Sequence, residues 1–386
     1  MTKTQAPTSR RQQVECVLRH EPPARIVYAP NYWQWFAHHK NHGLLPPELA
    51  HCRTQLDLIR HLGLDVFSRN IYSDQHHGWF GGLAEEVWEG VEFAETRRTG
   101  PTGDIILDKT YRTRAGTLTE RLRYVFADST LVQEKFLLDD YAQQMNAFEA
   151  LVAGRRWRFH PERYDAIQGE VGDDGIVNAG ELFSPLKLLH FAAGADTAVY
   201  LLEDFPERCA GVIRLHEEAQ LDLVRQMTAA RVPAMMAMDN LDSMFHTPAY
   251  VERCSAGFYE RASRLCHEAG AAFFIHACGR QRATLPLIAS LGVDGLEGVA
   301  YPPLGDVQLD EAMALAGGRF LITGGISAME TEKFQTADEV RRYVEDLFRR
   351  MRPHAHRFVF AASCNTSIRT PWKVIQWFRD AWKEFR

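Results

Sequence analysis

The sequence lacks the features that mark an exported, membrane-spanning or nucleic-acid-binding protein. Its formal net charge is −6 and its pI is near 6.2, so it has no basic excess for nucleic acid or an anionic membrane surface. No apolar run approaches the length of a membrane span, and the polar residues 1–15 contain no apolar signal-peptide core. We therefore expect a cytoplasmic protein that binds neither nucleic acid nor membrane.

Cysteine is present but not in the spacing of a disulfide framework. Seven cysteines are scattered along 386 residues, and without an export signal they are expected to stay reduced. Because cysteine is often a packing residue, five are interpreted as core: Cys16, Cys52, Cys209, Cys254 and Cys266. A Gly-x-Gly-x-x-Gly turn after an early strand is also missing, which argues against a doubly wound dinucleotide-binding fold.

Short apolar runs alternate with segments of helical spacing along most of the chain. The runs predict strands at residues 25–29, 64–68, 164–170, 232–238, 272–276, 292–296, 319–323 and 357–361. The spacing predicts helices at residues 141–153, 248–268 and 336–350. Strands that alternate with helices indicate parallel pairing, and this number of strands favours an α/β fold of the (β/α)8 TIM type.

Residues 79–128 interrupt this alternation. There, polar and apolar residues alternate between glycine-containing breaks, which is typical of antiparallel strands. We interpret the segment as an excursion after the second strand, inserted at about residues 79–163 of a single barrel domain that spans residues 1–386.

Three strong metal ligands follow the later strands. His276 and Cys278 end one strand, two positions apart, so their side chains point to the same side. Cys364 follows the last strand, and barrel active sites lie at this end of the strands. Two thiolates and an imidazole suit Zn²⁺ better than magnesium or calcium. The next strand carries Glu297, a candidate for the fourth zinc position in the resting state and for a catalytic role.

Other residues at predicted strand ends are weaker candidates. Asp239 and Asn240 are predicted to orient the substrate or a ligand imidazole, with capping of the next helix as the alternative. Glu170 ends the predicted third strand and is a candidate substrate-binding acid. The aromatic residues after the first strand either line an apolar substrate pocket or cover the barrel mouth or a homodimer contact: Tyr32, Trp33, Trp35 and Phe36.

Several segments resemble the uroporphyrinogen decarboxylase superfamily, in particular its zinc- and cobalamin-dependent methyltransferases. The similar segments are residues 11–30, 183–207, 273–298 with the His-x-Cys-Gly motif, and 362–378 with a Thr-Pro after the late cysteine. The resemblance covers nearly the whole chain and implies a (β/α)8 barrel. It also implies that His276, Cys278 and Cys364 bind zinc, with Glu297 in the place of a fourth ligand.

In the methyltransferases that the chain resembles, a methyl group moves between a corrinoid and a small molecule. The resemblance therefore implies cobalamin or another corrinoid, carried by a partner corrinoid protein, and a thiol acceptor or a methoxylated donor. Residues 298–306 resemble superfamily members linked to demethylation of methoxylated compounds.

Residues 31–36 depart from the true decarboxylases, which carry arginines there to bind porphyrinogen carboxylates; here the segment is aromatic and uncharged. Two alternatives remain open: a metal-free decarboxylase, and a non-catalytic zinc- or corrinoid-binding partner.

Overall fold

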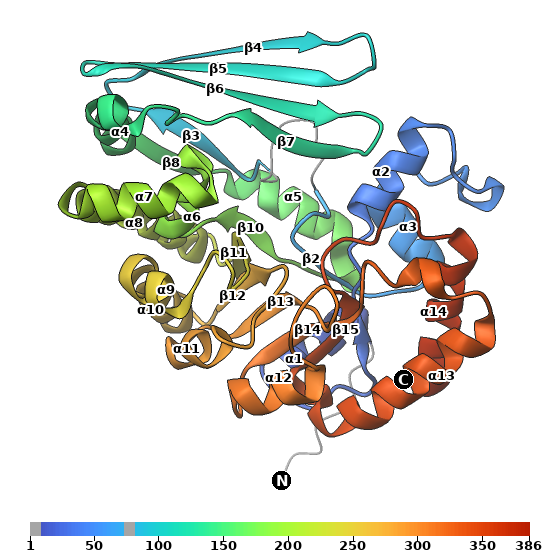
Figure 1. Ribbon diagram of the computed structural model, residues 1–386. Helices are drawn as coiled ribbons and strands as arrows, with labels where there is room; N and C mark the ends of the chain where they lie inside the picture. The colour runs from blue at the N-terminus through green and yellow to red at the C-terminus, as the bar shows by residue number, and fades with distance from the viewer. Residues whose placement is uncertain (1–8, 73–81) are drawn as a thin grey trace.

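A ring of parallel strands forms the centre of the protein, and helices surround it (Figure 1). The computed structural model describes residues 9–72 and 82–386. The strands of the ring are β1 (Val27–Tyr28), β2 (Val66–Ser68), β9 (Gly175–Val177), β10 (Ala179–Leu182), β11 (Ala234–Leu241), β12 (Ala272–Ala277), β13 (Gly295–Val299), β14 (Leu321–Ile326) and β15 (Phe358–Ala362).

The ring closes through strands that are far apart in the sequence. Seven strands pair in the order β1-β15-β14-β13-β12-β11-β10, and β2 pairs in parallel with β9. Asn178 alone separates β9 from β10, so these two are parts of one strand position. The circuit is completed between β1 and β2, where the Asp65 amide donates to the Tyr28 carbonyl at 3.0 Å. The (β/α)8 barrel expected from the sequence is confirmed.

Helices surround the ring, and several of them begin with a side-chain cap. They are α1 (Arg10–Leu18), α2 (Trp33–Asn41), α3 (Gln55–Leu62), α5 (Pro161–Val171), α6 (Pro185–Ala193), α7 (Ala195–Asp204), α8 (Pro206–Ala229), α9 (Pro248–Cys254), α10 (Ala256–Glu268), α11 (Leu285–Ser290), α12 (Leu309–Ala316), α13 (Ala337–Met351) and α14 (Trp372–Phe385). In α13, Thr336 and Glu339 form a capping box. Helix α13 buries Val340, Val344 and Leu347 along one face. The described helices include none that is long and apolar enough to cross a membrane.

An antiparallel excursion leaves the barrel between β2 and β9 (Figure 1). Its strands are β3 (Ala84–Trp88), β4 (Glu92–Thr99), β5 (Ile105–Thr113), β6 (Gly116–Val125), β7 (Thr130–Lys135) and β8 (Arg155–Phe159), with helix α4 (Tyr141–Gly154) between the last two. Strands β4 to β7 form one antiparallel sheet, and β3 pairs with β8. The antiparallel excursion was predicted correctly, although its expected start at Trp79 lies outside the described residues.

The predicted third strand at residues 164–170 is wrong. Those residues belong to α5, which begins at Pro161, a residue that suits the first turn of a helix. The third strand position is β9 with β10, where all the residues of both strands are buried. The apolar spacing around Tyr164 was too short to separate a buried strand from one turn of helix.

The core has two layers, inside and outside the ring. Phe67, Met236 and Phe274 belong to the inner cluster, and Phe67 and Phe274 meet edge to face with ring centroids 5.4 Å apart. Phe273 and Ile275 belong to the outer cluster, against the helices. Because successive strand residues face opposite sides, several strands contribute apolar residues to both layers, which explains the nearly continuous apolar runs in the sequence.

Candidate metal centre at the barrel mouth

The alternation along β12 places His276 inside the barrel. Ala272 and Phe274 lie in the inner cluster, so His276, two residues further on, faces the same interior at the carboxyl end of the strand. Glu297 is its direct neighbour across the parallel β12–β13 pair. Both side chains are buried, and this register brings the carboxylate to the imidazole.

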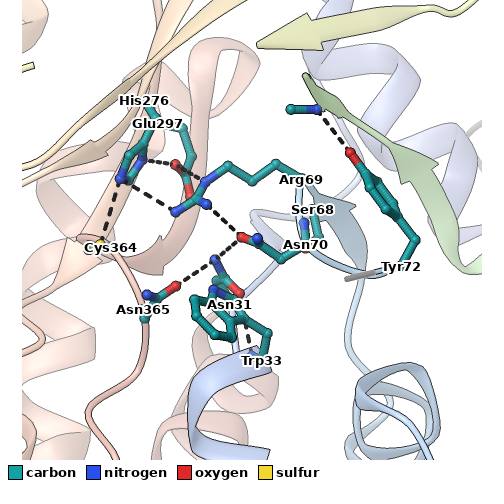
Figure 2. Close-up of polar contacts among 11 residues, drawn as sticks. Asn31, Trp33, Ser68, Arg69, Asn70, Tyr72, His276, Glu297, Cys364 and Asn365 are labelled. Carbon is teal, nitrogen blue, oxygen red and sulfur yellow. Dashed lines mark hydrogen bonds and ion pairs between the residues drawn. The ribbon is translucent and has the colours of Figure 1, made fainter. Parts of the chain in front are cut away.

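Two sulfurs lie on the other side of this imidazole. The Cys364 sulfur is 3.7 Å from His276 Nε2, and Cys278 is hydrogen-bonded to Cys364. A carboxylate oxygen of Glu297 contacts the opposite ring nitrogen, Nδ1 (Figure 2). His276, Cys278 and Cys364, which the sequence predicted to share one site, are therefore brought together, and Glu297 lies behind the imidazole rather than beside the sulfurs.

Arg69 is the member of this cluster that the sequence reasoning missed. It follows β2 directly, and its guanidinium lies 3.0 Å from Glu297 Oε2 and 3.4 Å from His276 Nε2. A third contact, of 2.6 Å, joins it to the Asn70 side chain (Figure 2). The same rule that selected His276 and Glu297, position at the carboxyl end of a barrel strand, also applies to Arg69.

The charges in the cluster shift its pKa values in opposite directions. Burial acts to raise the pKa of Glu297, but the charges of Arg69 and His276 and their hydrogen bonds outweigh it and hold this pKa at about 2. The hydrogen bond with Cys364 is the main cause that lowers the pKa of Cys278, and the charge of Arg69 adds to it. The same hydrogen bond, with burial, raises the pKa of Cys364. Cys278 is therefore the thiol that ionises first.

The donor set has the chemistry of a zinc site, although its atoms are not yet arranged around one point. Two ligands on one tetrahedral zinc, one sulfur and one nitrogen, lie roughly 3.5 Å apart. The separation of Cys364 Sγ and His276 Nε2, 3.7 Å, is close to that value. Among the residues that the structure describes, no group of three or more His, Cys, Asp or Glu side chains already has metal-holding geometry. Binding would require Arg69 to move away from His276 Nε2.

The two residues that end β11 have different surroundings. Asp239 is fully buried, and its carboxylate accepts hydrogen bonds from the Ser184 amide at 2.8 Å and from the Tyr259 hydroxyl. These partners hold Asp239 between β11, α6 and α10, and no contact with His276 is present among the described residues. Asn240 instead lines a cavity next to the cluster, with a left-handed backbone φ of 50°.

Of the four predicted aromatic pocket residues, Tyr32, Trp33, Trp35 and Phe36, only Trp33 lines this cavity. Tyr32 and Trp35 are buried in the core, where Tyr32 pairs with the Tyr28 hydroxyl at 3.1 Å and the Trp35 indole donates to the Thr370 carbonyl at 2.9 Å. Trp33 lines the cavity. Glu170 lies on the exposed side of α5, so its predicted place at a strand end is wrong along with the strand itself.

The excursion supplies one wall of the cavity. The cavity measures about 290 Å³ and reaches His276, Cys278 and Cys364. Tyr124 at the end of β6 and Ser129–Leu131 at the start of β7 face α2 across it. The side chain of Gln34 on α2 donates to the carbonyls of Asp128 and Ser129 and so fastens the hairpin tip over the barrel mouth.

These features define a (β/α)8 barrel with a buried imidazole, thiol and carboxylate cluster at the carboxyl ends of its strands. The chain belongs to the uroporphyrinogen decarboxylase (URO-D) family, whose model matches residues 142–385, more than half of the chain. The family resemblance seen in the sequence is thus confirmed. No curated protein matches the chain.

Solved structures share the fold at low identity. The chain is similar to a methyltransferase from Methanosarcina mazei, with a TM-score of 0.59 and 13% identity over 98% of this chain and 99% of the other. A weaker similarity is to D-psicose 3-epimerase of Clostridium cellulolyticum H10, with a TM-score of 0.35 and 9% identity over 58% of this chain and 83% of the other. The first similarity covers the excursion as well as the barrel, since almost the whole of both chains aligns.

Proposed function

We propose that the protein is a zinc-dependent methyltransferase that moves a methyl group between a corrinoid and a small molecule. The observation that carries the proposal is the placement of His276 Nε2 3.7 Å from the Cys364 sulfur, with Cys278 hydrogen-bonded to that sulfur. His276, Cys278 and Cys364 would hold the metal. Glu297 would orient the imidazole from Nδ1, and its direct coordination of zinc stays a prediction.

Zinc at this position supplies a Lewis acid, which lowers the pKa of a bound thiol or polarises a methoxy oxygen. A bound corrinoid would supply the methyl group to the thiol or would accept it from the methoxy compound. Trp33 and the β6–β7 hairpin flank the site. We place the corrinoid on a separate carrier protein.

The residues around the site favour this function over a decarboxylase. A decarboxylase for a polycarboxylate would need several unpaired cations, whereas the described cavity wall has one guanidinium, that of Arg69, and it is paired with Glu297. A non-catalytic metal-binding partner is the second alternative, and only turnover separates it from an enzyme.

Two measurements test the proposal. Metal analysis of the purified protein should find about one zinc per chain, and Cys278→Ala and Cys364→Ala should each lower the zinc content well below that value. Cys266→Ala is the matched control, because Cys266 is a fully buried thiol in α10 and outside the cluster. Zinc content that is independent of Cys278 and Cys364 would refute the metal centre.

Turnover is measured with methylcobalamin and a panel of thiols, and with reduced cobalamin and a panel of methoxyarenes. Methyl transfer in either direction that depends on Cys364 is the expected result. Full zinc occupancy without transfer to or from any panel member would support the non-catalytic alternative.

A further inference from the structure

The walls of the cavity indicate which molecules it accepts. We propose that the site takes a small, uncharged molecule that has a planar apolar part and oxygen substituents, in preference to a sulfonate, carboxylate or phosphate. The inference rests on the proposed function, because it treats the cavity beside His276 as the seat of the methyl donor or acceptor. It goes further in that it excludes anionic substrates.

Size sets the first limit. At about 290 Å³ the cavity is at the lower end of the range for small-molecule sites, which begins at roughly 300 Å³. Residues of the β6–β7 hairpin and of α2 form part of its wall, and His276 and Cys278 form another part. A single-ring compound or a short thiol fits this space, and a tetrapyrrole does not.

Charge sets the second limit. The guanidinium of Arg69 is the one cationic group on the described wall of the cavity apart from the His276 imidazole. It is already bound to Glu297 at 3.0 Å and to Asn70 at 2.6 Å. An anionic substituent would therefore enter next to the Arg69–Glu297 pair without a free side-chain cation to offset the loss of its hydration.

Lys187 is the other cation near the cluster, but it does not lie on the cavity wall. It belongs to α6, and its ammonium lies 4.7 Å from the centre of the Phe191 ring. Burial lowers the pKa of Lys187, and Lys187 is not among the residues that line the cavity. Lys187 therefore supplies no binding group for an anion inside the cavity.

Uncharged hydrogen-bonding groups provide the polar contacts instead. Asn240 and Thr130 line the cavity, and so do Gln34 and Asn365, whose amides already bond to the hairpin carbonyls and to Asn31. The indole nitrogen of Trp33 is buried and has no hydrogen-bond partner among the described residues, so it is a donor that an ether, hydroxyl or carbonyl oxygen can satisfy.

The same wall has flat apolar surface for the remainder of the ligand. The rings of Trp33 and Tyr124 and the side chains of Leu131 and Met238 line the cavity with the amides. Aromatic and aliphatic walls with a few uncharged donors match a planar molecule with oxygen substituents.

The test compares the binding of two pairs of ligands to the zinc-loaded protein at pH 7 by isothermal titration calorimetry. Each pair differs in one charged group: 2-methoxyphenol against 2-methoxybenzenesulfonate, and 3-methoxyphenol against 3-methoxybenzenesulfonate. We expect the uncharged member of at least one pair to bind at least tenfold more tightly than its sulfonate. A sulfonate that binds as tightly as its uncharged counterpart, or the absence of binding by both uncharged members, would overturn the proposal.

Two variants locate the ligand. Thr130→Lys adds a cation to the cavity wall and should shift the preference of each pair toward the sulfonate by at least fivefold. Thr117→Lys, on the exposed part of β6, is the matched control and should leave the preference unchanged. Trp33→Phe keeps the ring but removes the unpaired donor, and should weaken 2-methoxyphenol more than Trp377→Phe on α14 does.

The outcome is separable from that of the proposed function, because zinc content and methyl transfer are measured on the same samples. Zinc binding and methyl transfer together with sulfonate preference would leave the methyltransferase standing and refute the substrate class. Tight binding of an uncharged ligand by protein that holds no zinc would refute the zinc-dependent methyltransferase and leave the substrate class standing.

Discussion

Glu297 contacts Nδ1 of His276, and this contact turns Nε2 toward the Cys364 sulfur. The two residues are neighbours in the register of β12 and β13, so backbone pairing fixes the relation before any ligand binds. A carboxylate on one imidazole nitrogen sets the tautomer and makes the other nitrogen a better metal ligand. His276 and Glu297 therefore have the arrangement that is typical of a metal-binding histidine and the carboxylate that orients it.

Glu297→Gln should weaken zinc binding without removing it. The amide keeps the size of the side chain but loses the negative charge that makes the imidazole a stronger ligand, and loss of such a partner typically costs 10–100-fold in metal affinity, on the order found for other carboxylate–histidine pairs. Competition with a chromogenic chelator measures the affinity. Glu268→Gln, at the exposed end of α10, is the control. An unchanged affinity in Glu297→Gln would show that the contact has no role in metal binding.

Arg69→Met should destabilise the folded protein. It leaves the Glu297 carboxylate buried without its cation, which for a broken buried pair costs about 3–5 kcal/mol. Urea unfolding of the zinc-free protein gives the change in the free energy of unfolding. The double variant Arg69→Met/Glu297→Gln should recover a large part of the loss, because it removes the unpaired charge. A double variant as unstable as the single one would mean that Arg69 acts through packing alone.

Gly298→Ala should disrupt the site through the backbone. Gly298 has a φ of 100°, and a Cβ there would lie 2.4 Å from the Ala277 carbonyl oxygen and 2.7 Å from that of Ser363. We expect β13 to shift away from β12 and the zinc content to fall. Gly317→Ala is the matched control, since it also has a positive φ, 81°, but open space around it. Equal zinc content in the two variants would contradict the expected steric effect.

Glu181 should make stability depend on pH. Burial raises its pKa from 4.5 to about 7, despite hydrogen bonds from the amides of Leu83 and Ala84. Since the folded state holds this proton more tightly than the unfolded state, the stabilisation is complete below pH 4.5 and is lost as the pH rises through 7. The full effect is at most about 3 kcal/mol.

Glu181→Gln, which imitates the protonated form, isolates this contribution. The free energy of unfolding of the wild type minus that of the variant should fall between pH 4.5 and pH 7.5. Glu170→Gln, on the exposed side of α5, is the control for replacing a carboxylate by an amide. A flat difference for Glu181→Gln would place the pKa of this carboxyl at its ordinary value.

The barrel and the position of the cluster could be predicted because both follow from the way successive residues of a strand face opposite sides of the sheet. Strands buried on both faces leave apolar runs in the sequence, and the residue that follows each run lies at the barrel mouth. This reasoning selected His276, Cys278, Glu297 and Cys364 before the structure. Applied to residues 64–68 it also selects Arg69, which was overlooked because an arginine is not a metal ligand.

The residues that line the cavity could not be predicted from the sequence, because they depend on packing between distant segments. Tyr32, Trp33 and Trp35 are alike in type and close in the chain, and only the pitch of α2 decides that Trp33 alone faces the cavity. The contribution of Ser129–Leu131 depends on how the excursion folds back over the barrel. Neither relation has a signal in local spacing.

The closure of the ring between β1 and β15 has a consequence for biosynthesis. When a ribosome has completed His276, the sulfur of Cys364 is still 88 positions away, and β1 lacks the neighbour that completes its hydrogen bonds. Once Cys278 is also added, the nascent chain carries two of the three proposed zinc ligands on an open sheet, with its strand edges exposed to other chains. Metal acquisition should follow release from the ribosome, and chaperones that shield open sheet edges should matter most in that interval.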